Sequence, residues 1–188
     1  MQFLPGLEPE PAADRPDAAS DEWYTPKWLL AWLPAIWFDP CWCASSNVDT
    51  LSGLDVRNGS DGLAEDWASL FDRPGIVWVN PPYSDCAAWV ARCAEQARLL
   101  DRVVVALIPA KPGEVYWHTH IWGQAAVGFL RGRVAFDTIA GPGTESGLVG
   151  SALIVWGADE KADQVVLHIA RAARGHRQAP VWVRKRCD

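Results

Sequence analysis

The tetrapeptide Asn80-Pro81-Pro82-Tyr83 stands at a junction that strongly constrains the fold. It follows the short apolar run Gly75-Ile76-Val77-Trp78-Val79, which predicts a buried strand. An amphipathic helix is expected over residues 85–100, with Ser84 or Asp85 as its N-cap. The tetrapeptide therefore lies where a strand ends and a helix begins. In open α/β sheets, ligands bind at this edge.

The groups of the tetrapeptide suit a planar heterocycle that carries an exocyclic amine. Each proline lacks an N–H and fixes its own φ, so the loop is stiff and its proline carbonyls are acceptors. We expect the Asn80 side-chain oxygen and the Pro81 carbonyl to accept the two amine hydrogens, and the Tyr83 ring to stack on the heterocycle. The alternative is that Pro81 and Pro82 form a proline-rich turn that only ends the strand and binds no ligand.

Apolar runs and helical patterns alternate along the chain and predict a parallel or mixed sheet with helices on both faces. The expected strands are residues 36–38, 75–79, 103–108, 127–130, 133–136 and 151–156. The expected helical segments are residues 26–33, 63–70, 85–100, 114–122 and 160–174. Residues 41–62 and 141–150 are expected to be loops.

The first ordered segment is expected to start a helix and to contribute to a ligand site. Thr25 is a favourable N-cap, and Pro26 would then occupy the first helical position. Most of the tryptophans are expected in the core, but Trp23 and Tyr24 are placed to flank a flat cofactor.

Two acidic positions are candidates for the same edge of the sheet. Asp39 and Pro40 end the strand at 36–38, so the Asp39 carboxylate can hold an ammonium group or a ribose hydroxyl. The alternative is a turn-forming Asp-Pro pair. Asp61 and Asp66 form a second acidic cluster, for which the alternative is a loop followed by acidic residues in the first turn of a helix.

The net charge of −6 is unevenly distributed along the chain. Residues 161–188 hold seven Lys and Arg against two Asp, a net of +5. We therefore expect three parts: a disordered leader at 1–20, a domain at 21–175 and a basic tail at 176–188 that contacts phosphate. The alternative for the basic residues is a solvated surface. Neither a membrane-spanning run nor a secretory signal is visible, which indicates a cytoplasmic protein.

The five cysteines favour neither a disulfide framework nor a metal centre. Cys41 and Cys43 are too close in sequence for the usual zinc-binding pair, and Cys86 and Cys93 have no convincing second pair of ligands. We predict no metal and regard the cysteines as structural thiols.

The ordered motifs of residues 21–157 resemble the phage and prophage DNA N6-adenine methyltransferase (Dam-like) family. The matching pieces are Asp21-Glu22-Trp23-Tyr24-Thr25-Pro26, Phe38-Asp39-Pro40-Cys41, Asp61-Gly62-Leu63, Asp66-Trp67, Val77-Trp78-Val79-Asn80-Pro81-Pro82-Tyr83-Ser84, Trp89-Val90, Leu107-Ile108-Pro109-Ala110, Gly132-Arg133-Val134-Ala135-Phe136 and Gly150-Ser151-Ala152-Leu153. One departure is Cys41-Trp42-Cys43-Ala44-Ser45-Ser46, where many DNA methyltransferases have a glycine-rich turn.

The resemblance implies a class I, Rossmann-like methyltransferase fold with a doubly wound, mostly parallel sheet. It implies S-adenosyl-L-methionine as cofactor and double-stranded DNA, with one base flipped out, as substrate. Residues 23–26 and the Asp39-Pro40 strand end would hold the methionine part of the cofactor, and Asp61 its adenosine. Residues 80–83 would hold the target adenine, whose N6 would attack the sulfonium methyl group directly, without a nucleophilic cysteine.

Several alternatives remain open from the sequence. The same tetrapeptide serves cytosine N4 and RNA bases, and a catalytically inactive nucleic-acid-binding module can keep the fold. Residues 111–123, the loop at 141–150 and the basic tail are the candidate DNA-facing segments. The recognition sequence and the oligomeric state are not predicted.

Overall fold

The computed structural model describes residues 23–43, 46–50, 52–53, 60–70, 74–138, 141–143 and 149–183. The predicted leader at 1–20 lies outside these residues. The elements in chain order are α1 Lys27–Leu30, β1 Ile36–Asp39, β2 Ser52–Gly53, the 3-10 turn η3 Trp67–Leu70, β3 Ile76–Val79, the 3-10 turn η4 Tyr83–Asp85, α2 Cys86–Leu99, β4 Val104–Pro109, α3 Val115–His120, β5 Ala126–Leu130, β6 Ser151–Trp156, α4 Asp159–Ala172 and β7 Pro180–Val183.

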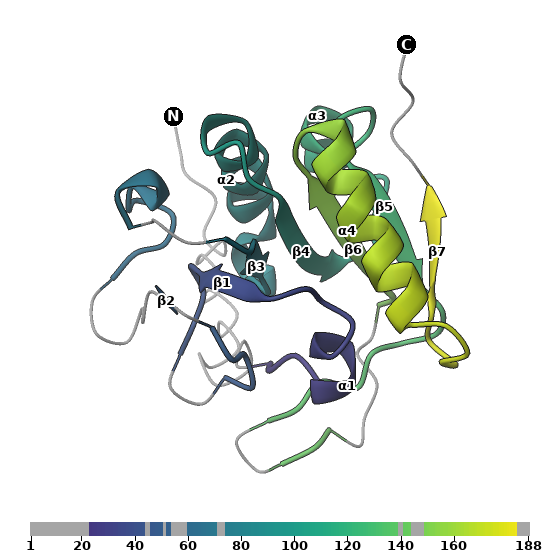
Figure 1. The fold of residues 1–188 in the computed structure, drawn as a ribbon. Coiled ribbons are helices and arrows are strands. Elements are labelled where there is room, and N and C mark those ends of the chain that lie inside the picture. Colours follow the sequence, from purple (N-terminus) through teal and green to yellow (C-terminus); the bar gives the residue numbers. More distant parts are fainter. Residues whose placement is uncertain are drawn as a thin grey trace, which may run out of the picture.

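A seven-stranded sheet in the order β2-β1-β3-β4-β6-β5-β7 forms the centre of the molecule (Figure 1). The pairs β1–β2, β1–β3 and β3–β4 are parallel. The pairs β4–β6, β5–β6 and β5–β7 are antiparallel. Strands β1 to β5 therefore all run one way, and β6 and β7 run the other way. The expected mostly parallel sheet holds for strand direction, but half of the neighbouring pairs are antiparallel, because β6 is inserted between β4 and β5 and β7 pairs with the other side of β5.

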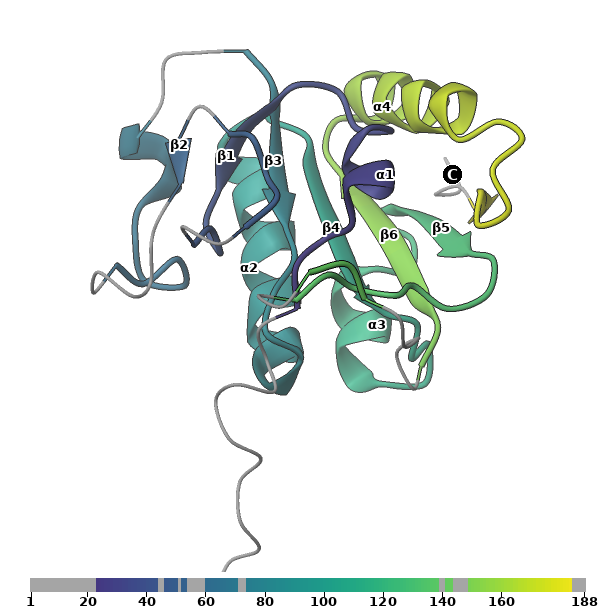
Figure 2. The same cartoon turned by 90° about the horizontal axis from the view of Figure 1, so that it is seen from below.

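Helices cover both faces of the sheet, as the alternating pattern predicts (Figure 2). Leu29 of α1 and Ile169 of α4 pack in the core on one face. Trp89 of α2 and Trp117 of α3 pack in the core on the other. Strands β1, β3, β4 and β6 are buried at every position, because successive side chains enter opposite cores. This two-sided burial explains why these strands appear in the sequence as continuous apolar runs.

The start of α1 differs from the prediction that Thr25 caps the helix. Pro26 is the N-cap, and no side chain caps the helix. Pro26 has the extended ψ of 142°, so the first helical residue is Lys27. Tyr24, the residue before Thr25, forms a β-bridge with Asp137, which keeps this segment extended. Thr25 is thereby held in an extended segment and not at the helix terminus.

The second half of the sheet also differs from the prediction. Residues 133–136 form no strand; β5 pairs instead with β7, with Leu130 opposite Pro180. Gly132 has a φ of +74° in the turn that ends β5, which diverts the chain from the sheet. Residues 180–183, which the sequence analysis placed in a basic tail, form this edge strand, and residues 184–188 lie outside the described part. The predicted loop at 41–62 contains the two-residue strand β2.

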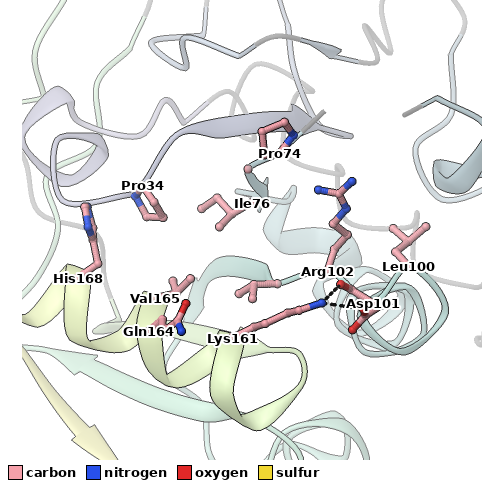
Figure 3. Close-up of a pocket in the computed structure, with 12 residues that line it drawn as sticks. Pro34, Pro74, Ile76, Leu100, Asp101, Arg102, Lys161, Gln164, Val165 and His168 are labelled. Atoms are coloured by element: carbon pink, nitrogen blue, oxygen red, sulfur yellow. Dashed lines mark hydrogen bonds and ion pairs between the residues drawn. The ribbon is translucent and has the colours of Figure 1, made fainter. Parts of the chain in front are cut away.

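A cavity of about 750 Å³ lies at the amino ends of β1, β3 and β4 (Figure 3). Ile76 and Val165 line it, together with Lys161, whose ammonium group lies 2.6 Å from an Asp101 carboxylate oxygen. None of the predicted site residues lines this cavity, because they lie at the opposite ends of the strands. Among the described helices, none has the length and apolar character needed to cross a membrane.

Candidate active site at the carboxyl edge of the sheet

The parallel strands bring the predicted site residues to one edge. Asp39 ends β1, and Asn80 directly follows β3, the neighbouring parallel strand. The segment 23–26 reaches the same edge from outside the sheet, where the Asn80 side-chain amide donates a hydrogen bond to the Trp23 carbonyl over 2.8 Å. Groups that are far apart in the sequence are thus held together, as predicted from strand direction.

The contact with Trp23 fixes the orientation of the Asn80 amide. A backbone carbonyl can only accept, so the Nδ2 of Asn80 must face Trp23 and the Oδ1 must face away. This Oδ1 is buried and has no hydrogen-bond partner among the described residues. A buried acceptor without a donor costs about 1–3 kcal/mol, and a ligand N–H can satisfy it. Asn80 therefore presents an acceptor for a ligand.

The two prolines after Asn80 have different positions. Pro82 starts the turn η4, and its carbonyl accepts the Asp85 N–H over 3.2 Å. Asp85 is the N-cap of α2, in agreement with the prediction, although its side chain makes no capping hydrogen bond. Pro81 is buried between Asn80 and this turn. The Pro82 carbonyl is committed to the turn, which leaves the Pro81 carbonyl as the predicted second acceptor.

The rings of Trp23, Phe136 and Tyr83 contact one another in a row. The Phe136 ring has its centroid 6.0 Å from that of Tyr83 and 6.2 Å from that of Trp23, with edge-to-face geometry in both pairs. Trp23 is 41% exposed, so part of its ring is open to a ligand. The Tyr83 hydroxyl is buried near Ser151 without reaching hydrogen-bond geometry, and burial raises its pKa above the usual value. Tyr83 therefore stays neutral at physiological pH.

Asp39 is a buried carboxyl group at the end of β1, 3% exposed. One of its oxygens accepts the Cys41 backbone N–H over 2.8 Å. Desolvation by burial raises the pKa of Asp39 from 3.8 to about 7, and the Cys41 hydrogen bond lowers it only in part. A cationic ligand would favour the ionised carboxylate, so Asp39 is a candidate partner for an ammonium group.

The Asp61 turn is packed against the end of β1. A Cβ on Gly62 would lie 2.3 Å from the Pro40 carbonyl oxygen, so only glycine allows this approach. The Trp67 indole N–H donates to the Gly62 carbonyl over 2.7 Å and anchors the turn. The Asp61 side chain itself is exposed and accepts the Leu63 N–H over 2.9 Å. The structure thus brings Asp61 beside Pro40, in a carboxylate-capped turn.

Asn47 and Asp137 also hold the site together, although the sequence analysis did not identify either. The Asn47 Nδ2 donates to the Asp137 carboxylate over 2.7 Å and to the Thr25 carbonyl over 3.1 Å. Asp137 also exchanges two backbone hydrogen bonds of 2.9 Å with Tyr24. Both residues lie in irregular segments, and only the position of Asp137 directly after the matched Gly132–Phe136 motif could have drawn attention to it.

Replacing Asp137 with alanine should destabilise the protein by about 1.5–3 kcal/mol, because the Asn47 amide loses a charged acceptor. Asp137→Asn keeps an acceptor oxygen, so it should recover most of that loss. Urea denaturation of both variants measures the difference. Equal stabilities of the two variants would show that the side-chain contact with Asn47 contributes nothing.

The described cysteines are free thiols. Burial raises the pKa of Cys41, Cys86 and Cys93, so each is protonated at neutral pH. Cys86 contacts the Tyr116 hydroxyl, at 3.7 Å, and lies one turn after the tetrapeptide. Within the described ranges, no three His, Cys, Asp or Glu side chains are grouped so that they could hold a metal ion.

The protein has an α/β fold in which a buried acceptor, a buried carboxyl group and a partly open aromatic side chain meet at the carboxyl ends of the parallel strands. This edge is the candidate ligand site. The chain belongs to the DNA N-6-adenine-methyltransferase (Dam) family, whose model matches residues 12–174. This match confirms the resemblance seen in the ordered motifs and indicates a DNA N6-adenine methyltransferase. It begins within the predicted leader and ends before β7. A comparison with curated proteins found no match.

Proposed function

We propose that the protein is an S-adenosyl-L-methionine-dependent DNA methyltransferase of the phage or prophage type, with a class I, Rossmann-like fold. Its product is N6-methyladenine, made on a base that is flipped out of double-stranded DNA. Residues 80–83 bind the base, residues 23–26 with Asp39 and Pro40 bind the methionine part of the cofactor, and Asp61 binds the adenosine.

The observation that carries this proposal is the orientation of the Asn80 amide. Its nitrogen donates to the Trp23 carbonyl, and its buried oxygen has no partner among the described residues. A neutral acceptor fixed in this way suits the exocyclic amine of a base. The Pro81 carbonyl, on the next residue, supplies the second acceptor. The side-chain oxygen is already oriented, so substrate binding need not reorganise it.

The residues beside Asn80 fit the cofactor. The Thr25 Oγ1 is buried without a partner among the described residues, so it can contact a polar ligand group. The Asp39 carboxyl group has a pKa of about 7, so a cationic group of the cofactor bound beside it would stabilise its ionised form. When bound, S-adenosyl-L-methionine supplies an electrophilic methyl group on a positively charged sulfur.

The chain's own groups then act by orientation and electrostatics. Flipping the base costs a few kcal/mol, which contacts with the protein must offset. Two acceptors on the amine hydrogens draw the nitrogen lone pair out of conjugation with the ring and direct it towards the electrophile. The Asn80 and Pro81 oxygens also stabilise the positive charge that develops on this nitrogen. The nitrogen loses one proton to solvent after methylation, and the Tyr83 ring packs against the base.

The test of the proposal is mass spectrometry of nucleosides from unmethylated DNA that has been incubated with the protein and methyl-labelled cofactor. We expect label in N6-methyladenine, and about 100-fold less initial labelling with the Asn80→Ala protein, which controls for contaminating host enzymes. Label in N4-methylcytosine, or label that appears only with RNA, would contradict the assignment of adenine in DNA as the substrate. Saturable cofactor binding without any transfer would indicate an inactive module of the same fold.

A further inference from the structure

Four exposed arginines gather at the β5–β7 corner, although they come from two distant parts of the sequence. Arg131 and Arg133 follow β5, and Arg174 and Arg177 lie between α4 and β7. The antiparallel pairing of β5 with β7 places Leu130 opposite Pro180. The Gln178 side chain donates to the Arg133 carbonyl over 2.6 Å and joins the two segments. Figure 1 shows the end of α4 turning into β7 beside β5. We call these four residues the arginine corner.

The arginine corner lies at the same edge of the sheet as Asn80. Strand β5 runs in the direction of β1, β3 and β4, so its carboxyl end shares their edge. From Arg133 the chain leads within three residues to Phe136, whose ring contacts Tyr83. None of the four guanidinium groups forms an ion pair with another described residue. Their positive charge is therefore available to a ligand beside the site.

The other flank of the site has the opposite charge. Beyond β1, the turn that packs on Pro40 exposes Asp61, Glu65 and Asp66. Arg92, whose guanidinium donates to the Glu65 carbonyl, is itself paired with Glu95 at 2.8 Å. The edge is thus acidic next to β1 and basic next to β5 and β7. An anionic polymer is favoured on the second flank and repelled from the first.

We propose that the arginine corner binds DNA backbone phosphates beside the flipped base and so fixes the side from which the duplex approaches. This proposal rests on the proposed function. Guanidinium groups bind phosphate oxygens through two parallel hydrogen bonds, which gives both charge and geometry. The acidic turn, in contrast, lies on the flank where the cationic cofactor binds. The charge difference between the flanks therefore assigns each substrate to its own side of the site.

The test measures the salt dependence of affinity for a short, mixed-sequence DNA duplex by fluorescence anisotropy between about 50 and 200 mM salt. A variant with all four arginines replaced by glutamine should show a plot of log affinity against log salt that is less steep by about 0.9 for each phosphate that the protein no longer neutralises. The fall in affinity should be equal for two unrelated duplex sequences, because phosphates carry no sequence information. The KM for DNA should rise while kcat and cofactor affinity are unchanged.

Arg98→Gln is the matched control, since Arg98 is an exposed arginine at the end of α2, on the opposite edge of the sheet. Its slope should equal that of the wild type. If the quadruple variant keeps the wild-type slope, the arginine corner does not bind DNA phosphates, even if the wild type methylates DNA normally. A flattened slope together with no methylation by the wild type would instead overturn the proposed function and leave the DNA-binding surface in place.

Discussion

Replacing Asn80 with alanine is expected to lower the rate of methyl transfer by about 100-fold or more, in line with the loss of one preorganised polar group from an active site. The variant loses the buried Oδ1 that the structure holds without a partner among the described residues. Affinity for the cofactor should stay near that of the wild type, because this oxygen faces the base in the proposed complex. Single-turnover kinetics and calorimetry measure the two quantities separately.

Two further variants separate the chemistry of Asn80 from its structural contact with Trp23. Gln124→Ala removes a comparable hydrogen bond, from a side-chain amide to the Thr119 carbonyl over 2.6 Å, at a position outside the site. It should leave the transfer rate unchanged. Asn80→Asp keeps an acceptor oxygen for the base, although it adds a negative charge and replaces the donor to Trp23 with a second oxygen. Its transfer rate should therefore lie between those of the wild type and Asn80→Ala. Transfer by Asn80→Ala at the wild-type rate would show that the site has been misassigned.

Replacing Asp39 with asparagine should stabilise the protein above neutral pH. The pKa of Asp39 is raised from 3.8 to about 7 in the folded state, so folding favours its protonated form. The contribution of Asp39 to the stability of the wild type is therefore most favourable below about pH 4. It becomes less favourable as the pH rises towards 7 and stays constant above that. A rise of the pKa from 3.8 to about 7 corresponds to roughly 4 kcal/mol of folding free energy lost above pH 7.

Urea denaturation at pH 5 and pH 8 tests this effect. The wild type should lose stability between pH 5 and pH 8 as Asp39 ionises, and Asp39→Asn should not show this loss. The matched control is Asp66→Asn, because Asp66 accepts an equivalent backbone hydrogen bond, from Ala68 over 3.0 Å, at the surface. The control should keep the pH dependence of the wild type. An Asp39→Asn protein that is as pH-dependent as the wild type would show that Asp39 ionises at an ordinary pKa.

The same substitution should weaken cofactor binding. Asp39→Asn removes the negative charge proposed to hold an ammonium group, so calorimetry should show reduced affinity at pH 8. In the wild type this affinity should fall as pH drops below about 7, where Asp39 becomes protonated. The stabilising change and the loss of binding then have one origin, a carboxylate kept in an unfavourable buried position for the sake of its ligand.

The strands and the positions of the polar groups that follow them could be predicted from the sequence. Residues 76–79 and 104–109 are buried on both faces, which requires an apolar residue at nearly every position and makes the runs easy to see. Asn80 and Asp39 directly follow such runs, so their meeting at one edge follows from strand direction alone. The order of the motifs was also enough to indicate the family, which the match over residues 12–174 confirms.

The contacts that orient the site were decided only by the tertiary structure. The Trp23 carbonyl that fixes Asn80 lies 57 residues away in sequence, and the Asp137 carboxylate that binds Asn47 lies 90 residues away. Neither contact has a local pattern, because each joins irregular segments whose backbones turn according to distant partners. The same reason explains why residues 180–183, which form β7, were predicted as part of a tail. Their partner strand β5 lies about 50 residues earlier, and the strand is recognisable only from its antiparallel pairing with β5.

The sequence by itself determined which polar side chains follow the central strands and are therefore candidates for the site, because burial imposes a local apolar pattern on every central strand. The tertiary structure decided the protonation and the hydrogen bonding of these side chains. It raised the pKa of Asp39 through complete burial, and it left the Asn80 oxygen without a partner among the described residues. It also brought Arg133 beside Arg177 through the Gln178 contact. Desolvation, orientation and the gathering of charge all depend on neighbours distant in the chain, so no local pattern encodes them.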